Sequence, residues 1–247
     1  MRKFGLIGYP LSHSFSQKYF SEKFKREHLT DCVYENFSLP SINELPRVLE
    51  TESFLRGLNV TIPYKEVVIP FLHESNDVVT KTGACNCIDI RDGKLSGFNT
   101  DIIGFEQSLK KQLKSSHKKA LILGTGGASK AVEYVIRKLD IDYKIVSRNP
   151  NNKSEKYISY DQVTESLMQS HTLIINTTPL GMFPDIRQCP PLPYQALSSD
   201  HYLFDLIYNP AKTIFLQKGE TAGATINNGL EMLIIQAEES WKIWNDR

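Results

Sequence analysis

The chain has 247 residues, of which 40% are hydrophobic and 23% charged, and its formal net charge is +1. This balance gives no reason to expect nucleic acid or a membrane as a partner, and no apolar run reaches transmembrane length. The apolar stretch that follows the basic N-terminus is interrupted at Pro10, so we expect no signal peptide. The length allows one large domain or two of ordinary size.

The cysteines are sparse, with four in the chain, which fits a reducing compartment and a cytoplasmic protein. Cys85 and Cys87 have a C-x-C spacing, but no second pair of cysteine or histidine residues follows nearby. We interpret them as alternating residues of a strand and expect no metal site.

Strand and helix signals alternate along the first hundred residues. The patterns predict strands at 3–8, 32–37 and 55–62, a helix at 15–28, a short helix after a capping box formed by Ser41 and Glu44, and an apolar helix near 65–72. Residues 84–90 and 94–99 read as a hairpin that turns at Asp92-Gly93.

The second half of the chain has a cleaner pattern. We expect a helix at 102–113, a basic and polar boundary at 114–119, strands at 119–124, 143–147, 171–178 and 202–208, a helix that ends near Leu139, and a last helix at 229–244. Strands separated by helices indicate βαβ units, so the sequence predicts two α/β domains with mainly parallel sheets.

The stretch NVTIPYKE, residues 59–66, ends a predicted strand with a lysine. Pro63 cannot donate to a strand ladder, so Lys65 would stand at the C-terminal end of the strand, where open α/β sheets bind ligands. Asp101 begins a predicted helix and, in a cleft, could form a proton-transfer couple with Lys65. The alternatives are a solvated lysine and a carboxylate that only complements the helix dipole.

A cluster of hydroxyls follows the first predicted strand. Ser12, Ser14 and Ser16 would lie at its C-terminal end and could bind a carboxylate or a polyol. The alternative is a serine-rich turn that caps the next helix.

The stretch LILGTGGASKAV predicts a dinucleotide-binding turn. Gly124, Gly126 and Gly127 lie between a strand and a helix whose N-terminus would offer N–H groups to a pyrophosphate, although Ser129 replaces the third glycine of the fingerprint. A plain strand–helix turn is the alternative. The next strand ends in Ser147 and Arg148 without an acidic residue, which favours the 2′-phosphate of NADP, and Lys153 could add charge.

Eight motifs together resemble the shikimate dehydrogenase family. They are GYPLSHSFS, NVTIPYKE, GACNCI, GFNTDIIG, GTGGASKA, NTTPLGM, FDLIYNP and NGLEMLIIQA, in the order of that family and over nearly the whole chain. The resemblance implies an NADP-dependent oxidoreductase that interconverts 3-dehydroshikimate and shikimate, in chorismate and aromatic amino acid biosynthesis. Its only partner would be this small molecule, without nucleic acid or membrane, and the protein would be a monomer or homodimer.

The resemblance also implies roles for individual residues. Lys65 and Asp101 would be the catalytic couple, with Ser14 and Ser16 at the substrate carboxylate, Thr61, Asn86 and Gln236 at the ring hydroxyls, Tyr208 beside the substrate, and Gly124, Thr125, Gly126, Gly127, Ala128, Arg148 and Gly229 at the cofactor.

The last helix, by the same resemblance, returns to the N-terminal domain. Residues 1–100 and 226–247 would then form the substrate-binding domain and 101–225 a Rossmann-like NADP-binding domain. The spacing of Gly229, Met232 and Gln236 along one helix edge allows Gln236 to reach a cleft.

Three rival functions remain open at this stage. One is a related enzyme that prefers quinate and NAD, against which Arg148 argues. Another is a ligand sensor without catalysis, against which Lys65 and Asp101 argue. The third is a folate-pathway dehydrogenase, which lacks the SHSFS serines.

Overall fold

The computed structural model describes residues 1–11, 15–150 and 154–246. They form two compact units, Met1–Thr100 with Gln236–Arg247, and Asp101–Ile235. The expected α/β class is confirmed. The chain returns to the first unit at Gln236, inside the last helix, whereas we expected it to return at residue 226. Which residues serve the substrate and which serve the cofactor stays a prediction.

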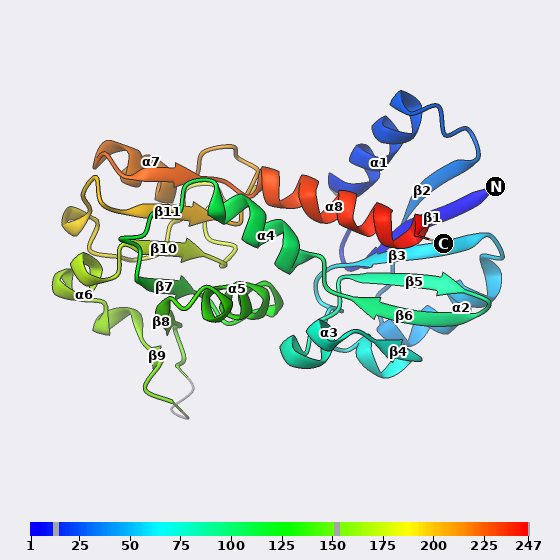
Figure 1. The fold of residues 1–247 in the computed structure, drawn as a ribbon, viewed down its shortest axis with the longest axis horizontal. Helices are drawn as coiled ribbons and strands as arrows, with labels where there is room; N and C mark the ends of the chain where they lie inside the picture. The colour runs from blue at the N-terminus through cyan, green and yellow to red at the C-terminus, as the bar shows by residue number, and fades with distance from the viewer. Residues whose placement is uncertain (12–14, 151–153, 247) are drawn as a thin grey trace. The chain divides into compact units, whose positions relative to one another are not determined.

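The first unit is built on a six-stranded sheet with the order β2-β1-β3-β5-β6-β4, which can be followed in Figure 1. Its strands are β1 (Arg2–Gly8), β2 (Cys32–Ser38), β3 (Leu55–Val60), β4 (Glu74–Ser75), β5 (Cys87–Arg91) and β6 (Lys94–Phe98). β5 runs antiparallel to β3 and β6, and the remaining pairs are parallel. The predicted hairpin is confirmed, because Asp92 and Gly93 both adopt the positive φ of a tight hairpin turn.

Apolar cores cover both faces of this sheet. Leu58 and Val60 of β3 face one core, which also holds the short helix α2 (Leu45–Thr51). Phe4 of β1 faces the other core, together with helix α1 (Phe15–Arg26) and the C-terminal part of α8 (Leu230–Asn245). Strand alternation therefore sorts the apolar side chains into two layers.

The apolar helix expected near 65–72 is wrong. The structure has turns there and a single 3-10 turn, Ile69–Phe71. Pro70 explains the difference, because it lacks an N–H and disfavours helical backbone at the residue before it. The next helix is α3 (Asp77–Thr82), and the capping box of Ser41 and Glu44 is present as expected.

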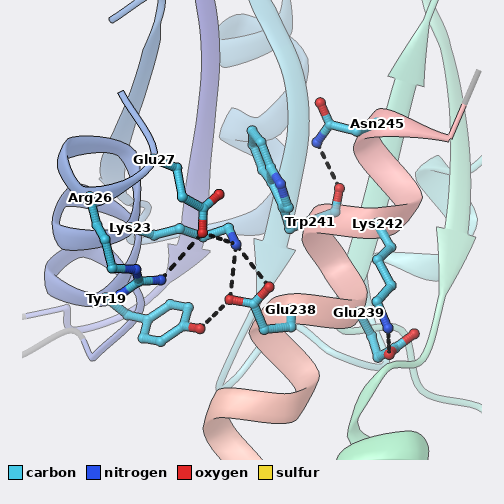
Figure 2. Close-up of polar contacts among 9 residues, drawn as sticks. All are labelled: Tyr19, Lys23, Arg26, Glu27, Glu238, Glu239, Trp241, Lys242 and Asn245. Carbon is cyan, nitrogen blue, oxygen red and sulfur yellow. Dashed lines mark hydrogen bonds and ion pairs between the residues drawn. The ribbon is translucent and has the colours of Figure 1, made fainter. Parts of the chain in front are cut away.

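A buried lysine joins α1 to α8 within the first unit (Figure 2). The Lys23 side chain is only 5% exposed and its Nζ lies 2.9 Å from Oε1 of Glu27 and 2.9 Å from Oε2 of Glu238. Tyr19 of α1 also donates to Glu238, and the Lys23 ammonium lies 5.8 Å from the Trp241 ring centroid. Two carboxylates and an aromatic face thus compensate one desolvated charge.

Close backbone approach also fixes α8 against the sheet. The indole Nε1 of Trp244 donates to the carbonyl of Ile88 at 3.0 Å, and a Cβ on Gly57 would lie 2.2 Å from that nitrogen. Only glycine leaves room for the indole at this place.

The second unit has a parallel sheet with the order β12-β11-β10-β7-β8-β9. Its strands are β7 (Lys119–Leu123), β8 (Asp142–Val146), β9 (Tyr157–Ile158), β10 (Leu173–Asn176), β11 (Tyr202–Asp205) and β12 (Thr225–Asn227). Counted from β7, this is the 3-2-1-4-5-6 order of a Rossmann fold, whose strand order reverses between β7 and β10.

Within the described residues of this unit, four more α-helices accompany the sheet; they are labelled in Figure 1. They are α4 (Asp101–Lys110), α5 (Gly127–Lys138), α6 (Glu165–Ser170) and α7 (Ile214–Thr221). Met168 of α6 and Phe215 of α7 share one apolar core with Leu121 and Leu203 of the sheet. No helix within the described ranges has both the length and the apolarity that a bilayer crossing requires.

We expect Glu238→Ala to lower the free energy of unfolding by about 1–2 kcal/mol, because it removes one of two carboxylates from a buried ammonium. Glu27→Ala should cost less, since Glu238 alone still binds Lys23 and Tyr19. The double variant should lose more than the sum, because the buried charge then lacks both carboxylates. Urea unfolding measures all three.

The matched control is Glu239→Ala, which breaks the pair with Lys242 at 2.5 Å, where the lysine side chain is 68% exposed. That pair should contribute at most about 1 kcal/mol. Additive effects of Glu27→Ala and Glu238→Ala would contradict the role of the buried charge.

Candidate active site

The strand that precedes Lys65 ends as the proline predicts. β3 stops at Val60, and the N–H of Thr61 still donates to the Ile7 carbonyl at 2.9 Å. The chain then turns, since the N–H of Tyr64 donates back to the Thr61 carbonyl at 2.9 Å. Lys65 therefore follows the C-terminal end of β3, and the parallel neighbour β1 ends at the same edge.

Main-chain hydrogen bonds tie this turn to the segment that precedes β5. The N–H of Cys85 donates to the carbonyl of Lys65 at 2.7 Å, and the N–H of Val60 donates to the carbonyl of Asn86 at 2.8 Å. The backbones of Lys65 and Asn86 are thus held beside each other.

Asn86 is buried and belongs to a dense polar cluster. Its Oδ1 accepts from the N–H of Thr100 at 2.7 Å, and its Nδ2 donates to the Thr100 hydroxyl at 3.0 Å and to Oε1 of Gln236 at 3.4 Å. Asn99 adds a second tie, because its Nδ2 donates to the carbonyl of Ala84 at 2.9 Å. The segments before β5 and after β6 and the first unit's part of α8 therefore meet at Asn86.

Ser16, the other residue predicted to bind the substrate carboxylate, lies in the first turn of α1. Ser14, predicted to bind the substrate carboxylate, and Lys153, predicted to add charge at the cofactor, lie outside the described residues. Asp101 is the first residue of α4 and opens the second unit, so the favourable charge at a helix N-terminus is present.

The glycine turn joins β7 to α5. Gly124 has a φ of +107°, and a Cβ there would lie 2.8 Å from Oγ1 of Thr177. Gly126 caps α5 with ordinary backbone angles, and a Cβ there would meet nothing within 4 Å. Thr125 and Gly126 are exposed. The two glycines thus serve different ends: Gly124 allows the turn, and Gly126 leaves open space at a helix N-terminus.

Ser129 explains how the turn tolerates the loss of the third glycine. Its Oγ donates to the carbonyl of Gly126 at 2.6 Å, and its N–H donates to the same carbonyl at 2.9 Å. The serine therefore stabilises the first turn of α5 from inside, where it is buried.

Arg148 lies at the same edge as the glycine turn. β7 and β8 pair in register up to Leu123 and Val146, and the N–H of Gly124 donates to the Val146 carbonyl at 2.8 Å. Arg148 follows two residues later and is exposed. Open helix N–H groups beside an arginine, at the edge where the strand order reverses, fit the pyrophosphate and 2′-phosphate of NADP.

Residues 6–88 match the family described as "Shikimate dehydrogenase substrate binding domain". The shikimate dehydrogenase (NADP(+)) of Methanosphaera stadtmanae is 34% identical, over 98% of this chain and 91% of that protein. The chain belongs to the shikimate dehydrogenase family.

Further members of the shikimate dehydrogenase family agree over the same length. The enzyme of Carboxydothermus hydrogenoformans is 36% identical over 97% of this chain and 90% of its own length. The structure of shikimate 5-dehydrogenase from Thermus thermophilus, in complex with NADP(H) and shikimate, has a TM-score of 0.87 and 29% identity, and the match covers 100% of this chain and 94% of that one.

Among the predicted site residues of this shikimate dehydrogenase family member, the structure brings together two groups. In the first unit, the backbone of Lys65 adjoins that of Asn86, whose side chain meets Gln236. In the second unit, the glycine turn adjoins the strand that leads to Arg148. Thr125, Gly127 and Ala128 lie in that turn or the first residues of α5.

Tyr208 and Gly229 lie close together in the loops around β11 and α8. Tyr208 follows β11 and is half-buried, which raises its pKa. The N–H of Gly229 donates to the carbonyl of Ile207 at 3.1 Å, and a Cβ on Gly229 would lie 2.0 Å from the carbonyl oxygen of Leu206. Packing against Leu206 therefore suffices to require a glycine at position 229. The contact of Gly229 with the cofactor stays a prediction.

Asp205 is a residue that the sequence analysis missed. It ends β11, is 0% exposed, and accepts hydrogen bonds from Nδ2 of Asn176 at 3.0 Å, the Thr213 hydroxyl at 2.6 Å and the Ile207 N–H at 3.1 Å. Burial raises its pKa to about 6, against these hydrogen bonds. The sequence signal for Asp205 was a single acidic residue within the apolar run YLFDLIY, residues 202–208.

The titration of Asp205 predicts a pH-dependent stability. The folded chain holds this proton up to about pH 6 and the unfolded chain only to about pH 4, so wild-type stability falls as pH rises between them. Relative to Asp205→Asn, the wild type should lose about 2–2.5 kcal/mol of unfolding free energy from pH 4 to pH 7. Urea unfolding across this range measures the difference.

Asp161→Asn is the control, because it removes an exposed carboxyl group of the same unit by the same substitution. A pH-independent difference for Asp205→Asn would contradict the raised pKa.

The glycine turn predicts two different alanine phenotypes. Gly124→Ala should lower thermal stability, because of its positive φ and the contact with Thr177. Gly126→Ala should leave the melting temperature within about a degree while weakening NADPH binding about tenfold or more, because the new methyl occupies the space where a pyrophosphate approaches. Differential scanning fluorimetry and fluorescence titration with NADPH separate the two effects. Unchanged NADPH affinity in Gly126→Ala would exclude the turn as the pyrophosphate site.

Proposed function

We propose that this protein is an NADP-dependent shikimate dehydrogenase that reversibly reduces 3-dehydroshikimate to shikimate. The observation that carries the proposal is the buried cluster of Asn86, Thr100 and Gln236, one main-chain hydrogen bond away from the turn that presents Lys65. Amide and hydroxyl groups at the edge of an α/β sheet suit a ligand rich in hydroxyls, and a lysine beside them suits proton transfer.

NADPH, when bound, supplies the hydride that reduces the C3 carbonyl of 3-dehydroshikimate. Lys65 donates the proton that the developing alkoxide requires, and its charge stabilises that oxygen during the transfer. Asp101 orients the Lys65 ammonium. In the reverse direction, Lys65 accepts the proton from the C3 hydroxyl of shikimate.

The remaining residues bind and orient. Ser14 and Ser16 hold the carboxylate, Thr61 joins Asn86 and Gln236 at the ring hydroxyls, and Tyr208 lies beside the substrate. Gly124 to Ala128 and Gly229 contact the cofactor, and Arg148 pairs with the 2′-phosphate. Residues 1–100 and 226–247 serve the substrate and 101–225 the cofactor. The four cysteines form no disulfide, and we propose a cytoplasmic location and a monomer or homodimer.

Quinate with NAD is the nearest alternative pair of substrates. No acid stands within the described residues Ser147–Pro150 that follow β8, where an NAD site expects one, and Arg148 is exposed there. These features favour NADP.

We expect rapid reduction of NADP with shikimate, and little with quinate or with NAD, when the purified protein is followed at the absorbance of the reduced cofactor. Lys65→Ala should lower kcat about a hundredfold to ten-thousandfold while shikimate still binds, because general acid catalysis is lost.

Lys81→Ala is the matched control, since it removes an exposed lysine of the first unit and should keep wild-type kcat. Turnover mainly with quinate or NAD would assign the protein to the alternative. Near-normal turnover in Lys65→Ala would remove the proposed acid, and no turnover with any pair would contradict the function as a whole.

A further inference from the structure

A chain of buried hydrogen bonds continues from Asn86 into the interior of the first unit. Asn59, on β3, donates from Nδ2 to the hydroxyl of Ser240 at 2.9 Å, and Ser240 lies 3.3 Å from the hydroxyl of Thr100. Ser240 in turn donates to the main-chain carbonyl of Gln236 at 2.9 Å. The exposed fraction of these side chains is between 0% and 5%. Residues from β3, from the end of β6 and from α8 thus share one network.

Main-chain groups fix which end of each asparagine amide in this network is the donor. The Thr100 N–H can only donate, so the atom of Asn86 that faces it must be Oδ1, and its Nδ2 faces Thr100 Oγ1 and Gln236 Oε1. The carbonyl of Asn86 can only accept, so the atom of Asn59 that lies 3.3 Å from it must be Nδ2. The buried phenol of Tyr34 satisfies the other end, since it donates to Oδ1 of Asn59 at 2.8 Å.

The Ser240 hydroxyl joins the two parts of the network, one that runs through Asn59 and one that runs through Thr100. Its single proton goes to the Gln236 carbonyl, and its lone pairs accept from Asn59 and from the Thr100 hydroxyl. A hydroxyl has one donor and two acceptor positions, so this side chain is fully used. The Thr100 hydroxyl accepts from Nδ2 of Asn86, and its proton is within reach of both Oδ1 of Asn86 and the Ser240 hydroxyl, each at 3.3 Å.

These directions determine which end of the Gln236 amide a ligand meets. Oε1 of Gln236 accepts from Asn86, and a flipped amide would set two N–H donors against each other. The amide end opposite Asn86 is therefore the donor, Nε2. Under the proposed function, this donor pairs with an acceptor oxygen of the substrate.

We propose that Ser240 is a positioning residue for the reaction: through Thr100 and Asn86 it holds Gln236 with its amide donor toward the substrate, without touching the substrate itself. This inference rests on the proposed function. It assigns Ser240 an effect on substrate recognition that a merely structural serine would not have, because a loss of folded protein lowers apparent kcat and leaves KM unchanged.

The first experiment compares Ser240→Ala with the wild type in shikimate oxidation. We expect the KM for shikimate to rise about five- to tenfold, with the KM for NADP unchanged and kcat within about twofold. Ser240→Cys keeps a weak donor and acceptor in a side chain of similar size, so its KM should lie between the two, and it tests the proposal even if Ser240→Ala folds poorly.

Ser108→Ala is the matched control. Ser108 is another fully buried helical serine with two side-chain hydrogen bonds, to Glu231 and from Asn227, in the second unit. Its loss should lower stability without changing the KM for shikimate.

A double-mutant cycle with Gln236→Ala identifies the route of the effect. If Ser240 acts through Gln236, Ser240→Ala should add less than about twofold to the KM of the Gln236→Ala protein. A wild-type KM in both Ser240 variants, or an undiminished effect in the Gln236→Ala background, would overturn the positioning role while the wild-type activity stands. A wild type inactive on shikimate would overturn the proposed function, and with it this role.

Discussion

One main-chain hydrogen bond, from the N–H of Thr100 to Oδ1 of Asn86 at 2.7 Å, determines much of the first unit. A backbone amide has one direction in which to donate and cannot rotate to suit a partner, so it fixes which end of the Asn86 amide faces Thr100. From that orientation follow the acceptor end of Gln236 and the role of the buried hydroxyls behind it. The backbone therefore sets the orientation of the buried side-chain amides. A wrong orientation would leave a buried donor without an acceptor, which is costly.

The fold could be predicted where the signal is local. Alternating residues gave the strands before Lys65 and around Asp92, and apolar runs gave the buried strands β10 and β11, because each element's own side chains face the core that forms it. The helix expected near 65–72 failed for an equally local reason, since apolar content outweighed Pro70 in reading the pattern. The antiparallel pairing of β5 with β3 joins segments that no local pattern relates.

The site divides in the same way. The glycine turn and Arg148 could be found because spacing along the chain places them at the ends of consecutive strands. Asn59 and Ser240 could not be found, since they act through partners far away in sequence; Asp205 left one signal, an acid within an apolar run, but its hydrogen-bond partners were not predictable. Ser240 lies one helical turn after Gln236, and Asn59 lies two residues before Thr61. This spacing places each residue near a predicted site residue, but it does not show which group each one contacts. Buried polar residues acquire a role only when the fold supplies their complement.

The split of α8 has a consequence for biosynthesis. The chain emerges from the ribosome with Gly57 and Asn59 already made, while Trp244 and Ser240 follow only after the whole of the second unit, Asp101–Ile235. Until then, the space above Gly57 lacks the Trp244 indole and Asn59 lacks the Ser240 hydroxyl. The second unit can complete its sheet before these contacts form. The first unit therefore completes its packing only after the whole of the second unit has been synthesised.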